Sequence, residues 1–138
     1  MDTNTHRRLC GVLGVGLLAL AGGGVALVGA ALFRTPTTAV QVVLIGAAGL
    51  LDAVAAFRNP VTARIDWFRL GGLANVALGL ALPVGVLGWG GGGRGTLLLA
   101  VTALGGLSLA AIGVDMALYA GAHVYERPLD AANRVKGS

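Results

Sequence analysis

Four long apolar runs constrain this chain more than any other feature of its sequence. They extend over about residues 9–33, 38–57, 70–89 and 96–122, and charged residues separate them. A helix needs about 20 apolar residues to cross a hydrocarbon core of about 30 Å, and each run meets that length. A helix also satisfies its backbone hydrogen bonds internally, whereas a β-barrel needs alternating strands of about ten residues. The sequence therefore predicts an all-α integral membrane protein with four transmembrane helices.

The composition agrees with lipid as the surrounding solvent. Hydrophobic residues make up 56% of the 138 residues and charged residues 12%, about half the roughly 25% that is usual in soluble domains. The basic residues lie at the ends of the apolar runs, which is typical of membrane proteins and argues against nucleic-acid binding. We expect one transmembrane domain over residues 1–125 and a short cytoplasmic tail over 126–138.

The connections between the apolar runs are short. They comprise a turn at residues 34–37, a loop at 58–69 and a glycine turn at 90–95. Short connections make consecutive helices antiparallel neighbours, so the sequence predicts an up-down-up-down bundle.

The distribution of basic residues predicts the orientation in the membrane. Only Arg34 and Arg94 lie on one side of the predicted bundle. The other eight lie on the opposite side: Arg7, Arg8, Arg58, Arg64, Arg69, Arg127, Arg134 and Lys136. Cytoplasmic loops carry the excess of Lys and Arg, so both termini are expected in the cytoplasm of a multi-pass cell-membrane protein. At the predicted helix boundaries, aromatic residues are expected to face the membrane interface: Trp67, Phe68 and Trp89.

A cleaved signal peptide is an alternative interpretation of the first run. Arg7 and Arg8 precede an apolar stretch with a small-residue site at Ala19-Leu20-Ala21. The run continues to Phe33, which is longer than a usual signal core, and the sequence leaves both interpretations open.

The two halves of the chain also suggest a repeated helical hairpin. Gly11 and Gly72 correspond at an offset of 61 residues, and Asp52 and Asp115 correspond at an offset of 63. A duplication would produce this pattern, although apolar sequence also aligns with itself easily.

Asp52 and Asp115 are the strongest candidates for a functional role. A carboxylate at the centre of a membrane helix costs about 2.5–3.5 kcal/mol, so such residues usually face the bundle or water. Asp52 shares a helical face with Gln41, and Asp115 shares one with Ser108 and Tyr119. Asn75, in the third run, could reach the same layer. These acids are expected either to fix helix packing by pairing with arginines or to form an ion or proton site.

Small residues form stripes at helical spacing on the second and fourth runs. They are expected to let helices approach closely where lipid supplies no hydrophobic drive, within the chain or between copies. The residues are Gly46, Gly49, Gly106, Ala110, Gly113 and Ala117.

No motif in the sequence points to catalysis, a metal or a cofactor. Gly90-x-Gly92-x-x-Gly95 matches a dinucleotide-binding pattern by letter, but it lies in a turn between two apolar runs and no strand precedes it. The two histidines, His6 and His123, lack the spacing of a metal or haem site. We therefore expect a protein that is not an enzyme.

Two functional hypotheses remain at this stage. The first is a structural, accessory or assembly subunit that acts through helix packing, as a homo-oligomer or in a larger membrane complex. The second is a small oligomeric transporter or channel in which Asp52 and Asp115 couple proton or ion movement.

Overall fold

The computed structural model describes residues 3–87 and 93–123, which form helices and contain no strand. Its elements in chain order are α1 (Thr3–Val28), η1 (Gly29–Phe33, a 3₁₀-helix), α2 (Pro36–Ala56), α3 (Pro60–Arg64), α4 (Trp67–Val86) and α5 (Gly93–Tyr119). Four of these helices, α1 with η1, α2, α4 and α5, are long and apolar enough to cross a membrane. The prediction of an all-helical chain with four such helices is confirmed.

The ends of the long helices differ by a few residues from the expected runs. α2 begins at Pro36, because proline has no N–H to leave unpaired and its φ is already helical. α1 begins at Thr3, well before the apolar run, because the polar residues around Arg7 continue the helix. It gives way to η1 at Gly29, whose φ of +65° is incompatible with an α-helix.

The expected loop between the second and third runs contains a short helix, α3. The side chain of Asn59 accepts hydrogen bonds of 2.9 Å from the N–H groups of Val61 and Thr62. The Thr62 hydroxyl accepts a 2.9 Å bond from the N–H of Asn59, which completes a capping box. Asn59 also donates to the carbonyl oxygen of Val54, near the end of α2. The Asn-Pro pair therefore ends one helix and begins the next. Residues 90–92 of the expected glycine turn lie outside the described residues, and residues 93–95 belong to the first turn of α5.

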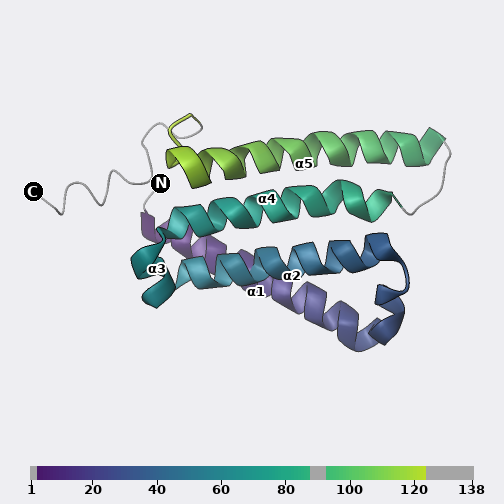
Figure 1. Ribbon diagram of the computed structural model, residues 1–138, viewed down its shortest axis with the longest axis horizontal. Coiled ribbons are helices and arrows are strands. Elements are labelled where there is room, and N and C mark those ends of the chain that lie inside the picture. The colour runs from purple at the N-terminus through teal and green to yellow at the C-terminus, as the bar shows by residue number, and fades with distance from the viewer. Residues whose placement is uncertain (1–2, 88–92, 124–138) are drawn as a thin grey trace, which may run out of the picture.

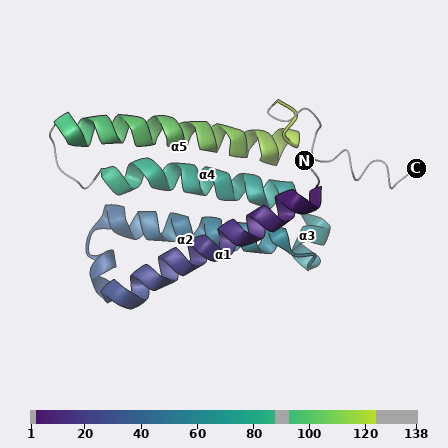
Figure 2. The ribbon, with the colours of Figure 1, turned by 180° about the vertical axis from the view of Figure 1, so that it is seen from behind.

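The long helices pack against one another in chain order, α1 on α2, α2 on α4 and α4 on α5 (Figures 1 and 2). The start of α1 and the short α3 lie at one end of the molecule, and η1 and the start of α5 lie at the other. α1 crosses α2 obliquely, whereas α4 and α5 run alongside each other. The row is therefore flanked by α1 and α5, and each of these makes extensive contact with one long neighbour only.

α4 and α5 touch backbone to backbone at two glycine pairs. A Cβ atom added at Gly79 would overlap the carbonyl oxygen of Gly106 and lie 2.9 Å from the nitrogen of Ala110. One added at Gly72 would lie 2.5 Å from the carbonyl oxygen of Gly113. Only glycine permits this separation, which maximises van der Waals contact between the helices.

α1 and α2 have one comparably close approach, at Gly14 and Gly49. A Cβ atom at Gly14 would lie 2.5 Å from the nitrogen of Ala53 and 2.8 Å from the carbonyl oxygen of Gly49. A Cβ atom at Gly11 would lie 3.1 Å from that of Ala56.

The aromatic residues at the start of α4 are buried. Trp67 and Phe68 are 7% and 3% exposed and pack with Ala55 and Leu70. The expectation that they face the membrane interface is therefore wrong, because the first turn of α4 lies beside α2 and contacts it. Trp89 lies outside the described residues.

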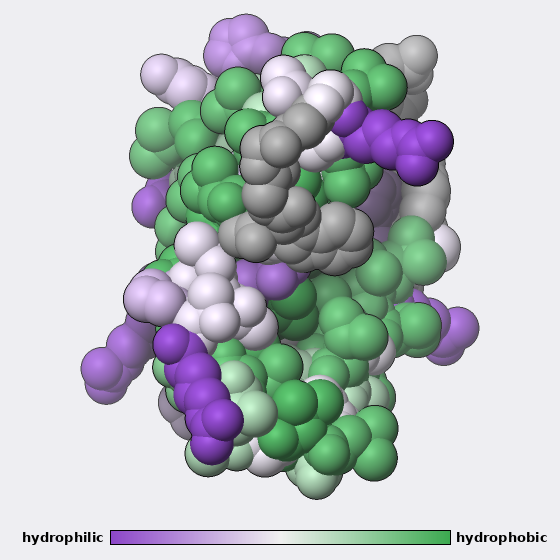
Figure 3. Space-filling view, turned by 90° about the vertical axis from the view of Figure 1, so that its right-hand side faces the viewer, coloured by the Kyte–Doolittle hydropathy of each residue, from purple (hydrophilic) through white to green (hydrophobic). Residues whose placement is uncertain are grey.

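Large apolar side chains cover much of the surface. Figure 3, an end view of the molecule, shows mostly hydrophobic atoms with isolated hydrophilic groups between them. Leu27, Val12 and Leu104 are at least 71% exposed, and none of the large side chains described by the structure is fully buried. The interior is built mainly from glycine and alanine, and most of the large apolar side chains point outward.

Candidate functional site

All four long helices meet around Gly71 of α4. A Cβ atom placed on this glycine would lie 3.6 Å from the sulfur of Cys10, 3.8 Å from a carboxylate oxygen of Asp52 and 3.8 Å from the methyl carbon of Met116. These atoms belong to α1, α2 and α5, respectively. We call Cys10, Asp52, Gly71, Asn75 and Met116 the polar junction.

Asp52 is the buried acid of the polar junction. It is 5% exposed, and Ala48 and Ala55 on either side of it along α2 are fully buried. The Cys10 sulfur lies in the same layer, beside the Cβ position of Gly71. Among residues 3–87 and 93–123 no ion pair joins Asp52 to an arginine. The small residues around Asp52 are what allow three other helices to approach it.

Asn75 extends the junction by one helical turn along α4. Its side-chain amide donates to the sulfur of Met116 in α5 at 3.5 Å. Asn75 therefore links α4 to α5 within the layer where α1 and α2 also meet. Met116 and Cys10 were not predicted from sequence, because single sulfur-containing residues in apolar runs carry no periodic signal.

Asp115 forms a separate site with His123, outside the polar junction. One carboxylate oxygen lies 2.6 Å from the His123 Nδ1, and the other accepts the backbone N–H of His123 at 3.3 Å. The Tyr119 ring packs edge-on against the imidazole, with centroids 5.1 Å apart. The chain reverses after α5 through the left-handed residues Ala120 and Gly121. This reversal of the chain direction places His123 beside Asp115.

The pairing of Asp115 was not predicted. The N–H of Gly121 donates to the carbonyl oxygen of Asp115 at 3.1 Å, which closes the turn at the end of α5. A glycine just past the last apolar residue was the available signal for this turn. As with Asp52, no described ion pair joins Asp115 to an arginine.

Two further candidates lie away from both acids. Gln41 lies toward the other end of α2, where its amide packs directly against Gly85 of α4. The exposed hydroxyl of Ser108 donates to the carbonyl oxygen of Leu104 within α5 at 2.8 Å. The structure therefore does not gather the predicted polar residues into one site.

The small residues singled out in the sequence lie at helix contacts. Gly106, Ala110, Gly113 and Ala117 of α5 lie against α4, where they are within reach of Cβ atoms added at Gly72, Gly79 or both. Gly49 lies against the backbone of α1, and Gly46 lies 4.0 Å from the Ala21 side chain, measured from an added Cβ atom.

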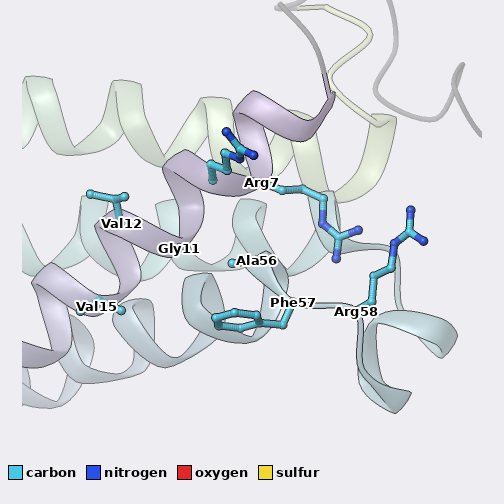
Figure 4. A pocket seen from close by; sticks show the side chains of 8 residues that line it. Arg7, Gly11, Val12, Val15, Ala56, Phe57 and Arg58 are labelled. Atoms are coloured by element: carbon cyan, nitrogen blue, oxygen red, sulfur yellow. The ribbon is translucent and has the colours of Figure 1, made fainter.

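A broad groove of about 850 Å³ opens between the start of α1 and the end of α2 (Figure 4). At one end it is lined by arginines, and along its length by exposed apolar side chains. We call it the arginine groove, and its principal residues are Arg7, Arg8, Arg58, Val12, Val15 and Phe57. The sequence did not predict that Arg7, Arg8 and Arg58 would line one groove. Arg7 and Arg8 precede the first apolar run and Arg58 follows the second, so an antiparallel pair of helices would bring these arginines together.

A model of a family of unknown function, DUF7994, matches residues 5–130. The chain belongs to the DUF7994 family. No curated protein and no solved structure matches it. The range matched to DUF7994 contains the polar junction, the Asp115–His123 pair and the arginine groove.

The chemistry available in this DUF7994 chain is that of hydrogen bonding and charge. In the part of the chain that the structure describes, no three His, Cys, Asp or Glu side chains come together in a group that could hold a metal ion. The polar junction places a carboxyl group, a thiol and an amide where four apolar helices meet.

Proposed function

We propose that the chain is a multi-pass protein of the cell membrane that works as a non-enzymatic structural, accessory or assembly subunit. Its four long helices cross the bilayer as an up-down-up-down set, with both termini in the cytoplasm. It acts through helix packing, either as a homo-oligomer or within a larger membrane complex.

The placement in the membrane is supported by apolar exposure and by charge. A soluble protein rarely exposes contiguous apolar patches larger than a few hundred Å², whereas a lipid-facing surface is apolar. Arg7, Arg58 and Arg64 lie at the end of the molecule that holds α3, and Arg34 and Arg94 lie at the other end (Figure 1). With the basic tail included, the excess of positive charge favours a cytoplasmic location for the α3 end.

The assembly role is supported by the exposed outer faces of the helix row, above all that of α1. In the apolar window of α1 only 6% of the residues are buried, against 33% in that of α4. Gly16 and Gly23 lie seven residues apart on one face of α1, and a Cβ atom at either has open space around it. Small residues on a lipid-exposed face favour close approach of another helix, since a larger side chain would keep it away.

The test is the assembly state after gentle extraction. The full chain with a Gly16→Leu and Gly23→Leu double substitution is compared with the wild type in lipid nanodiscs, by light scattering and by analysis of co-purifying proteins. We expect the wild type to form an oligomer or a stable complex and the double variant to lose it. Val43→Phe, which adds bulk at a position of α2 that is 62% exposed and lies outside this face of α1, is the control. A monomeric wild type without a partner would refute the assembly role.

A second candidate function is favoured by the burial of Asp52 among four helices. An intramembrane carboxylate commonly marks a proton or ion pathway. In this alternative the chain is a small oligomeric transporter or channel, and Asp52 and Asp115 couple transport. Asp52→Asn and Asp115→Asn should then abolish proton- or ion-linked flux in liposomes, and unchanged flux in the double variant would exclude the role.

A further inference from the structure

We propose that the arginine groove binds one anionic phospholipid of the cytoplasmic leaflet. Its phosphate lies among Arg7, Arg8 and Arg58, and an acyl chain follows the apolar wall toward Val15. This proposal rests on the membrane placement proposed above but not on the assembly role.

The positive end of the groove is not neutralised by any carboxylate of the described residues. In residues 3–87 and 93–123, no ion pair joins Arg7, Arg8 or Arg58 to a carboxylate. The side chains of Arg7 and Arg58 extend to the same end of the groove (Figure 4). Phosphate oxygens match the guanidinium group in charge and in planar, two-bond geometry.

The rest of the groove is apolar and open. Val12, Val15 and Phe57 are 72%, 60% and 65% exposed, and all three line it. Val15 lies eight residues beyond Arg7, or roughly 12 Å along the helix axis at 1.5 Å per residue. An acyl chain attached to a phosphate at the arginines would cover this wall, whereas a free phosphate or an acidic peptide would contact the arginine end only.

The position of the groove agrees with this occupant. It lies at the end of the molecule that carries most of the basic residues, where anionic headgroups of the cytoplasmic leaflet are expected. Basic pockets between transmembrane helices on that side are suited to phospholipid headgroups, because the charge lies at headgroup depth and the apolar wall below it.

Native mass spectrometry of the delipidated full chain tests the proposal, with phosphatidylglycerol and phosphatidylcholine supplied in equal amounts. We expect one retained lipid, with phosphatidylglycerol favoured. Each arginine contributes roughly fivefold, so Arg7→Gln with Arg58→Gln should lower the preference about 25-fold. Arg64→Gln with Arg69→Gln removes the same charge on the same side but outside the groove, and should leave the preference unchanged.

Further measurements separate lipid from free phosphate and keep the test independent of one variant. Soluble glycerol phosphate should not displace the lipid at equal concentration, and Val15→Trp should weaken retention by filling the apolar wall. Equal retention of the two lipids by the wild type, or equal loss in both double variants, would overturn the proposal. Displacement by glycerol phosphate would also overturn it. Resistance of each variant to carbonate extraction shows separately that membrane placement is intact.

Discussion

The two helical hairpins, α1 with α2 and α4 with α5, share a packing register but differ in how tightly they close. Added Cβ atoms at Gly11 and Gly72 meet Ala56 and Ala117, respectively, at 3.1 Å each. All of these positions are related by the same offset of 61 residues. The α4–α5 hairpin nevertheless makes two backbone contacts through glycine pairs, whereas α1 makes one with α2 and crosses it obliquely (Figure 2).

The α4–α5 hairpin is tightly packed, whereas the α1–α2 hairpin leaves surface on which the proposed ligands could bind. α4 is fixed between α2 and α5, and its contacts leave little exposed backbone to recruit another helix. α1 has an open small-residue face and borders the arginine groove. The proposed partner and lipid sites both fall on the hairpin that closes less tightly.

The acidic residues do not follow the shared register. At an offset of 61, Asp52 corresponds to Gly113 rather than to Asp115, and the two acids have different partners. The common register supports an ancestral duplication, while the different crossing of the two hairpins argues against it, so the repeat stays a prediction.

The largest effect is expected from breaking the tighter hairpin at its centre. Gly79→Val would push α4 away from Gly106 and Ala110, and because α4 also contacts α2, two interfaces would be disturbed. We expect a loss of about 3 kcal/mol in the free energy of unfolding, the upper range for overpacking. Thermal unfolding in detergent measures it. Gly105→Val, at a neighbouring glycine with open space around its Cβ position, is the control and should change stability little.

A smaller effect is expected from the matching change in the looser hairpin. Gly14→Val would separate α1 from Gly49, but α1 has one long neighbour and can shift outward. We expect a loss of about 1–2 kcal/mol, measured in the same way, with Gly22→Val, at a glycine of α1 with open space around its Cβ position, as the control. A loss equal to that of Gly79→Val would contradict the contrast between the hairpins.

The smallest effect is expected at the Asp115–His123 pair. The imidazole side chain is 71% exposed and that of Asp115 is 10% exposed, and a hydrogen bond of this kind contributes about 1 kcal/mol. His123→Ala should therefore lower the stability by about 1 kcal/mol, and Tyr119→Phe, which keeps the ring contact, should lower it less. If His123→Ala were as damaging as Gly79→Val, the end of α5 rather than its glycine contacts would hold the second hairpin.

Helix number and approximate position could be predicted from the sequence, because the length of an apolar run is a local property. The site could be predicted only in part. Asp52 stood out as a charge in an apolar run, but its neighbour Cys10 is 42 residues away in the sequence. The sequence showed only that His123 lacks the spacing of a metal site. The turn at Gly121 places His123 beside Asp115.

The sequence by itself determined that this chain forms four long apolar helices, since hydrophobic length and backbone hydrogen bonding are written in consecutive residues. It also marked the small residues along which helices can approach. Only the tertiary structure decided which helices meet. Gly71 brings four helices to one layer, and the end of α2 joins Arg58 to Arg7 of α1 in a groove. Such contacts depend on where close packing is sterically allowed, and spacing along one helix does not reveal which residue of another helix will face it.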